Sequence, residues 1–287
     1  MEALTAERRS QLCLGLDPDP SALSPDAAPD ADQAGVAERT AVAVTELCRS
    51  LIERAGPACV AVKPQLACFE RLGAPGWGAL ADVCRSAREA GLLVIADGKR
   101  GDVPVTAEAY GQALVGATGT PWGPVEGLGA DAFTANPLLG GDALDPLVDA
   151  AAEAGAGIFV LVRTSNPGAA ALQDAELDGT PLREHLAGLV AERAPRLAGK
   201  SGLSGMGAVV GATAPEHLAR LRELMPDSVF LLPGVGAQGG KVEDLGPALA
   251  ADRPASILVA AARSIAGADD PGAAAEELRA SLWTLTE

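Results

Sequence analysis

The chain has 287 residues, of which 48% are hydrophobic, which suits one large α/β domain or two small ones with a sizeable core. A formal net charge of −16 gives a surface that repels nucleic acid and anionic membranes, so neither is expected as a partner. Any anionic small ligand must therefore be held by a local cationic pocket.

Eight short apolar runs recur along the chain, and each is continuous rather than alternating. Continuous runs are expected for strands buried on both faces of a parallel sheet. In chain order the runs are 11–17, 58–63, 92–97, 131–136, 157–163, 207–212, 229–234 and 256–261. Helical patterns lie between them, for example over 36–55, and Gly91 is a C-cap signal for the helix that precedes it.

This alternation predicts a (β/α)8 TIM barrel over 1–287 as a single domain. A doubly wound open sheet is the alternative, because periodicity alone does not separate the two. Two stretches have loop compositions. Residues 18–35 are rich in Pro, Ala and Asp and are expected to form a mobile surface loop, and residues 114–130 are rich in Gly and Pro.

Cysteine and histidine usage excludes further classes of protein. Five cysteines, an odd number with no CxxC pair, favour a reducing, cytoplasmic compartment over a disulfide scaffold. Residues 1–11 lack the apolar core of a signal peptide, and no apolar run approaches the ~18–20 residues that span a bilayer. His185 and His217 lie in polar, helix-like stretches, so no metal site is expected.

Polar or charged side chains stand at or just beyond the ends of the apolar runs. In a barrel these strand ends share one rim, which is where active sites are built. The residues concerned are Asp17, Lys63, Asp97, Asn136, Arg163 and Arg263.

The stretch PGVGAQGG (233–240) matches GxGxxG through Gly234, Gly236 and Gly239. A dinucleotide fingerprint requires an acidic residue at the end of the strand that follows, and none is present there. The stretch follows the seventh apolar run, where barrels often bind phosphate. Gly236 and its neighbours let backbone N–H groups approach an anion, and Arg263 supplies a permanent cation, although a simple glycine-rich turn remains the alternative.

The stretch DGKRGD (97–102) places mixed charge at the end of a buried strand. Lys63 ends the preceding strand, where a lone ammonium is costly unless it snorkels to the rim or is paired. If strand geometry persists through Lys99, Asp97 and Lys99 point to the same side. Asp102 lies in the following loop, from which it can reach across a subunit boundary. The alternating charges would keep one another ionised.

The sequence resembles the orotidine 5′-phosphate decarboxylase family, and most closely its longer bacterial type (type 2). The motif D-x-K-R-G-D-I-x-x-T-A of that type reads Asp97-Gly-Lys99-Arg100-Gly-Asp102-Val103-Pro-Val-Thr106-Ala107 here, with valine at 103 as a conservative departure. The matching segments keep the family order and span 11–266. Besides that motif they are LGLDP, AVKPQ, VRTSNPGA, PGVGAQGG and ARSI.

The resemblance implies a (β/α)8 homodimer with shared active sites that converts orotidine 5′-phosphate to UMP and CO2 in de novo pyrimidine biosynthesis, with no cofactor. Lys99 would donate a proton to C6, and Asp97 would lie against the substrate carboxylate. Lys63 would belong to the charged network and touch the ribose. Asp102 and Thr106 would reach into the partner's site.

The resemblance also implies how the substrate is bound. Asp17 would hold a ribose hydroxyl, and Ser165 would hydrogen-bond the amide edge of the pyrimidine. Gln238 and Arg263 would bind the phosphate. Two alternatives remain: a metal-dependent sugar-phosphate decarboxylase of the same barrel superfamily, and a non-catalytic nucleotide-phosphate sensor.

Overall fold

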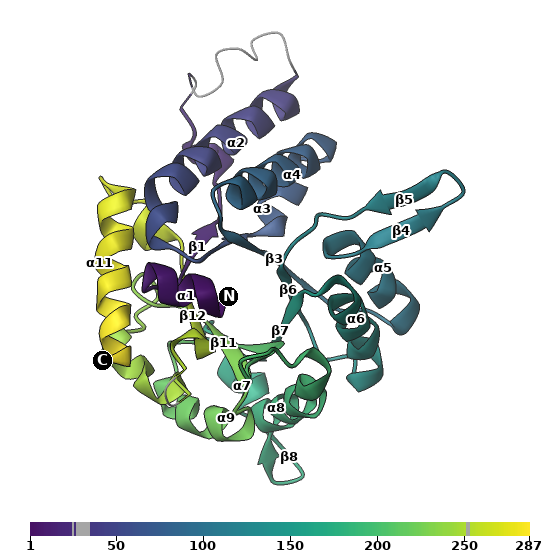
Figure 1. Ribbon diagram of the computed structural model, residues 1–287, viewed down its shortest axis with the longest axis vertical. Coiled ribbons are helices and arrows are strands. Elements are labelled where there is room, and N and C mark those ends of the chain that lie inside the picture. The colour runs from purple at the N-terminus through teal and green to yellow at the C-terminus, as the bar shows by residue number, and fades with distance from the viewer. Residues whose placement is uncertain (25, 27–34, 251–252) are drawn as a thin grey trace.

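The computed structural model describes residues 1–24, 26, 35–250 and 253–287. A closed barrel of eight parallel strands lies at its centre (Figure 1). Around the barrel their order is β1-β12-β11-β10-β7-β6-β3-β2. The strands are β1 Leu12–Leu16, β2 Ala61–Pro64, β3 Leu93–Arg100, β6 Ala132–Ala135, β7 Gly157–Arg163, β10 Ser204–Val210, β11 Ser228–Pro233 and β12 Ile257–Ala261. All eight predicted strands are confirmed, and closure of β12 on β1 excludes the open sheet.

Helices lie around this barrel, apart from α1, which lies across one of its ends (Figure 1). They are α1 Glu2–Arg8, α2 Val36–Ala55, α3 Leu66–Glu70, α4 Ala74–Glu89, α5 Pro104–Leu114, α6 Gly141–Ala154, α7 Ala169–Gln173, α8 Leu182–Arg193, α9 Leu218–Leu224, α10 Arg263–Ala266 and α11 Pro271–Trp283. Short 3-10 turns are η1 Pro20–Ala22, η3 Gly56–Ala58, η4 Ala194–Leu197, η5 Pro215–His217, η6 Val242–Ala248, η7 Pro254–Ser256 and η8 Thr284–Thr286. Helix α2 has the predicted bounds, and Gly91 after α4 has the left-handed φ of 70° expected of a helix terminator.

Each barrel strand divides its side chains between two cores, because successive side chains point to opposite faces. In β1, Leu12 and Leu14 pack outward under the helices, whereas Cys13 points into the barrel. Helix α1 closes the inner core at the amino ends of the strands (Figure 1). Leu4 of this helix and Met1, which precedes it, pack against the inner core. The carboxyl ends of the strands lie at the other end of the barrel and form the candidate active site.

The prediction that residues 114–130 form only a loop is wrong in part. Strands β4 Ala117–Thr120 and β5 Gly123–Glu126 form an antiparallel hairpin that projects from the ring of helices (Figure 1). A second hairpin, β8 Glu176–Leu177 and β9 Thr180–Pro181, turns at Asp178 and Gly179. Both turn residues have positive φ, 52° and 77°, as the Asp-Gly turns of tight hairpins require.

Part of the expected loop at 18–35 falls among the undescribed residues, which are 25 and 27–34 in that stretch. Its mobility therefore stays a prediction. Within the described part of the chain, no helix is long and apolar enough to cross a bilayer.

Candidate active site

A cavity of about 570 Å³ opens at the carboxyl ends of the barrel strands. Pockets of roughly 300–1,000 Å³ are typical of small-molecule sites. Each strand contributes an inward-facing residue to its floor. These residues are Gly15, Lys63, Asp97, Thr134, Leu161, Val209, Leu231 and Ala260. The floor is thus polar where β2, β3 and β6 lie side by side and apolar where β7, β10, β11 and β12 meet it.

The polar half of the floor is an ionic network centred on one carboxylate. Lys63 Nζ lies 2.5 Å from Asp97 Oδ2, and Lys99 Nζ lies 2.6 Å from Asp97 Oδ1. Gln65 Nε2 donates to Oδ2 at 3.4 Å, and Thr134 Oγ1 donates to Oδ1 at 2.9 Å. Both oxygens of Asp97 are therefore saturated by donors, as a buried carboxylate requires.

Asp97 and Lys63 stay ionised although both are buried. Burial alone would raise the pKa of Asp97, but the charges and hydrogen bonds of Lys63 and Lys99 outweigh it and lower the pKa to about 2. Burial would lower the pKa of Lys63, but the charges of Asp97 and Asp17 raise it above its ordinary value. The site is thus a preorganised set of charges at neutral pH.

Strand β3 extends to Arg100, but its regular geometry is interrupted at Lys99, so the condition under which the sequence placed Asp97 and Lys99 on the same side is not met. The pairing register of β3 and β6 shifts between Ala96 and Arg100, and Lys99 has a left-handed φ of 49°. The Lys99 ammonium still reaches Asp97. Arg100 turns away from the cavity and pairs with Glu70, with its guanidinium carbon 5.2 Å from the centre of the Tyr110 ring.

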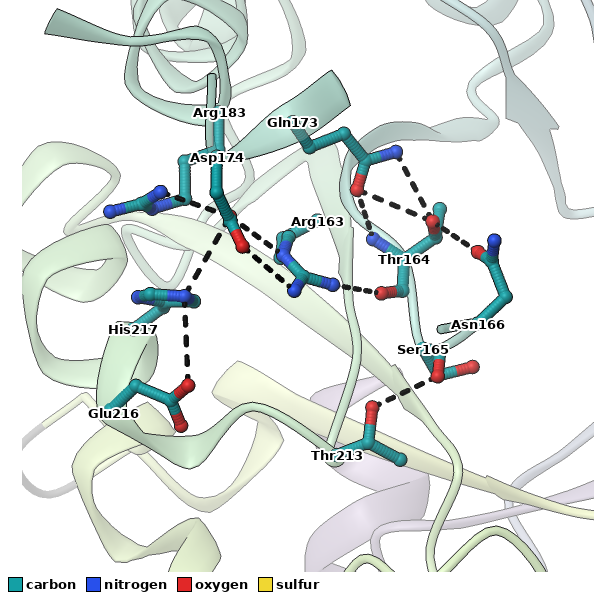
Figure 2. Close-up of polar contacts among 10 residues, drawn as sticks. All are labelled: Arg163, Thr164, Ser165, Asn166, Gln173, Asp174, Arg183, Thr213, Glu216 and His217. Carbon is teal, nitrogen blue, oxygen red and sulfur yellow. Dashed lines mark hydrogen bonds and ion pairs between the residues drawn. The ribbon is translucent and has the colours of Figure 1, made fainter. Parts of the chain in front are cut away.

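One wall of the cavity is the segment 164–166, which follows β7 and carries Ser165. Figure 2 shows how this segment is held from behind. Arg163 donates through Nη1 to the carbonyl of Thr164 at 2.6 Å, and Gln173 Oε1 accepts from the Thr164 amide at 2.7 Å. Arg163 is in turn fixed by Asp174 through two bonds of 2.9 and 3.0 Å. Arg163 therefore braces the wall and does not line the cavity.

A second wall, two strands away around the barrel, is the glycine-rich loop after β11. Its three motif glycines, Gly234, Gly236 and Gly239, have positive φ of 104°, 74° and 92°. The Gly236 amide donates to the Gly240 carbonyl at 2.9 Å, so it shapes the turn. Gln238 and Arg263 line the cavity from this side. Ser165 Oγ donates to Gln238 Oε1 at 2.9 Å and so joins the two walls.

The structure brings together most, but not all, of the site residues predicted from the sequence. Those that line the cavity are Asp17, Lys63, Asp97, Lys99, Ser165, Gln238 and Arg263, together with Asn136. The described lining residues do not include Asp102, Thr106 or Gly236. Asp102 Oδ1 accepts from the Val103 amide at 2.8 Å just before α5, and Thr106 is exposed on the first turn of that helix.

Sequence reasoning missed Thr134, Gln65 and Gln173, all of which line the cavity. Thr134 interrupts the apolar run 131–136, and a polar residue at an inward-facing position of a barrel strand is a usable signal. Gln173 gives no such signal, because α7 and its approach to Thr164 depend on the tertiary fold. Among the described residues, no cluster of three His, Cys, Asp or Glu side chains is arranged to hold a metal ion.

Comparison with known proteins shows which family the chain belongs to. Residues 10–278 match the model of the "Orotidine 5'-phosphate decarboxylase / HUMPS family". An orotidine 5'-phosphate decarboxylase of Rhodopirellula baltica is 41% identical over 252 residues, covering 87% of this chain and 81% of the relative. One of Deinococcus radiodurans is 41% identical over 279 residues, covering 95% and 90%.

Solved structures agree. The Leishmania donovani OMP decarboxylase superposes with a TM-score of 0.75 at 35% identity, covering 99% of this chain and 98% of that one. The UMP synthase of the same organism gives 0.76 at 37% identity, covering 99% and 56%. On sequence and on structure alike, the chain belongs to the orotidine 5'-phosphate decarboxylase / HUMPS family.

Proposed function

We propose that this protein decarboxylates orotidine 5′-phosphate to UMP and CO2 without a cofactor, as a step of de novo pyrimidine biosynthesis. The observation that carries the proposal is the Lys63–Asp97–Lys99 network on the cavity floor, with Asp97 held between two ammonium groups at 2.5 and 2.6 Å. Family membership supplies the substrate, since the relatives named above are orotidine 5'-phosphate decarboxylases.

The chemistry needs a cation at the carbon that loses CO2. Heterolysis of the bond between C6 and its carboxylate leaves the electron pair on C6, in an orbital that is not delocalised into the ring. The Lys99 ammonium stabilises that charge and then transfers its proton to C6, which completes UMP, and the lysine regains a proton from solvent. Asp97 holds Lys99 in place and disfavours the adjacent substrate carboxylate.

The two walls supply binding energy away from the reacting carbon. Arg263 and Gln238 would bind the phosphate beside the glycine-rich loop, and Ser165 would bind the pyrimidine edge. Asp17 and Lys63 would hold the ribose. Because the phosphate is remote from the bond that breaks, its binding energy can order the charged network.

The test is turnover by the purified protein, followed by the loss of absorbance of orotidine 5′-phosphate and by chromatography of the product. We expect one UMP formed for each substrate consumed. Stoichiometric binding without turnover would overturn the proposal in favour of a nucleotide-phosphate sensor.

Chelation tests the metal-dependent sugar-phosphate decarboxylase. Exhaustive chelator treatment should leave turnover unchanged, since the lysines supply the positive charge. Loss of activity that Mg²⁺ restores would favour that alternative, against which the segment Ser165-Asn166-Pro167 and the motif with Arg100 and Thr106 argue.

We further propose that the whole chain is one domain and acts as a cytoplasmic homodimer with shared sites. The five free cysteines, four of them buried, suit a reducing compartment. The position of Asp102 and Thr106 outside the cavity of their own chain suits a role in a neighbouring one.

A further inference from the structure

Thr134 is a buried polar residue on the cavity floor, 1% exposed, in the middle of β6. Its hydroxyl accepts from the Lys99 backbone N–H at 2.8 Å and donates to Asp97 Oδ1 at 2.9 Å. A hydroxyl has one hydrogen to donate, and an ionised carboxylate only accepts, so the chain of bonds has a single direction. It runs from the Lys99 amide through Thr134 to Asp97.

This side chain stands where the backbone ladder is interrupted. Ala96 pairs with Phe133 and Arg100 pairs with Ala135, so β3 advances by four residues while β6 advances by two. Within the interruption the Lys99 amide finds Thr134 Oγ1 instead of a backbone carbonyl. The left-handed φ of Lys99, 49°, is a conformation that costs a non-glycine residue free energy and persists only where its surroundings fix it.

Both ends of Lys99 are therefore tied to the same carboxylate oxygen. Its ammonium contacts Asp97 Oδ1 directly at 2.6 Å, and its amide reaches that oxygen through the Thr134 hydroxyl. These three contacts together restrain both the backbone and the side chain of Lys99. Without the hydroxyl, the amide of Lys99 loses its acceptor and Asp97 Oδ1 loses one of two donors.

We propose that Thr134 is a positioning residue for catalysis, which fixes the left-handed backbone of Lys99 and thereby aims its ammonium at the reacting carbon. The inference rests on the proposed function for the role of Lys99. Thr134 lies on the cavity floor and not in the walls proposed to bind the phosphate and the pyrimidine. We therefore expect it to affect the chemical step and to leave the binding of those two groups unchanged.

Thr134→Val removes the hydroxyl at nearly constant volume, and Thr134→Ser keeps it. We expect Thr134→Val to lower kcat by about 10- to 100-fold with KM within about threefold of wild type, because small misplacements of a catalytic group are costly. Thr134→Ser should keep kcat within about threefold of wild type. Thr45→Val is the matched control, because Thr45 is also buried but bonds the Ala41 carbonyl within α2. Its kcat should be unchanged.

A second measurement does not depend on turnover. Amide hydrogen exchange, read at Lys99, should be at least about tenfold faster in Thr134→Val than in wild type and Thr134→Ser, with global unfolding monitored in parallel. If wild type does not turn over orotidine 5′-phosphate, the proposed function fails, and exchange still tests the bond at Lys99. If Thr134→Val does not fold, Thr134→Ser and the protection of Lys99 in wild type carry the test.

Three results would overturn the inference. The first is Thr134→Val with kcat within about threefold of wild type. The second is an equal loss of kcat in Thr134→Ser, which would assign the effect to the methyl group. The third is rapid exchange of the Lys99 amide in wild type.

Discussion

Lys63 and Lys99 contact different oxygens of the same carboxylate, that of Asp97, and differ in their access to the cavity. The Lys63 side chain is 9% exposed, whereas that of Lys99 is 42% exposed. The buried lysine offsets the charge of Asp97, and the open one presents its ammonium where a ligand can meet it. This difference in exposure supports the proposal that Lys99 is the proton donor.

Lys99→Ala should therefore abolish turnover while leaving product binding in place. We expect kcat to fall by at least about a thousandfold, since the lost interaction is made mainly in the transition state, and the Kd of UMP to change by less than about tenfold. Turnover by steady-state kinetics and UMP affinity by calorimetry measure the two. Lys200→Ala, at an exposed lysine outside the cavity, is the control and should match wild type. A kcat within about tenfold of wild type would remove Lys99 as the proton donor.

The lowered pKa of Asp97 predicts a contribution to stability at acid pH. Because the pKa falls from 3.8 to about 2 on folding, the ionised group stabilises the folded state above pH 3.8. That stabilisation is lost as the pH falls through about 2. Between pH 5 and pH 2 wild type should lose about 2 kcal/mol more unfolding free energy than Asp97→Asn, as measured by denaturant titration.

Asp97→Asn should be less stable than wild type at pH 5, because buried Lys63 loses its partner. The informative quantity is the difference between the two pH dependences. Parallel losses of unfolding free energy in the two proteins would contradict the lowered pKa of Asp97.

Arg222 stabilises the barrel at a distance from the site. Its guanidinium lies 3.8 Å from the centre of the Phe230 ring and is buried, and burial, with the charge of Arg253, lowers its pKa to about 10. It donates to four backbone carbonyls at 2.6–3.1 Å, those of Met225, Ser228, Ala248 and Ser256. Arg222→Met would remove these four bonds to buried carbonyls and should cost about 3 kcal/mol or more of unfolding free energy, with kcat unchanged.

Arg220, two residues before Arg222 on helix α9, provides the control for Arg222. Its side chain is 54% exposed and pairs with Glu184 and Glu223. Exposed pairs contribute little, so Arg220→Met should cost much less unfolding free energy than Arg222→Met. Equal losses in the two variants, measured by urea unfolding, would mean that the carbonyl contacts of Arg222 contribute nothing specific.

The barrel could be predicted from the sequence because its signal is local. Continuous apolar runs such as 157–163 mark strands buried on both faces, and charge at their ends marks the rim. The route by which Lys99 reaches Asp97 could not be predicted, because it depends on a register shift between β3 and β6. The brace of Gln173 on Thr164 depends likewise on tertiary contacts.

Asp102 provides the test of the shared site. It lies beyond Gly101 and before α5, outside the cavity of its own chain, from which it can project toward a second barrel. If each site takes Lys99 from one chain and Asp102 from the other, Lys99→Ala and Asp102→Ala should each be inactive alone and should recover activity when mixed. A mixed dimer has one site with both residues intact and one site that lacks both.

Random exchange makes about half of the dimers mixed, so about a quarter of all sites should become active, provided that the subunits exchange and each defect is local. Turnover before and after co-incubation measures the recovery, and mass spectrometry of differently tagged chains confirms exchange. A double variant, Lys99→Ala with Asp102→Ala, mixed with Lys99→Ala is the control and should stay inactive, because none of its dimers contains an intact Lys99. Exchange without recovery in the mixture of single variants would mean that Asp102 acts within its own subunit, and the shared site would be wrong for this protein.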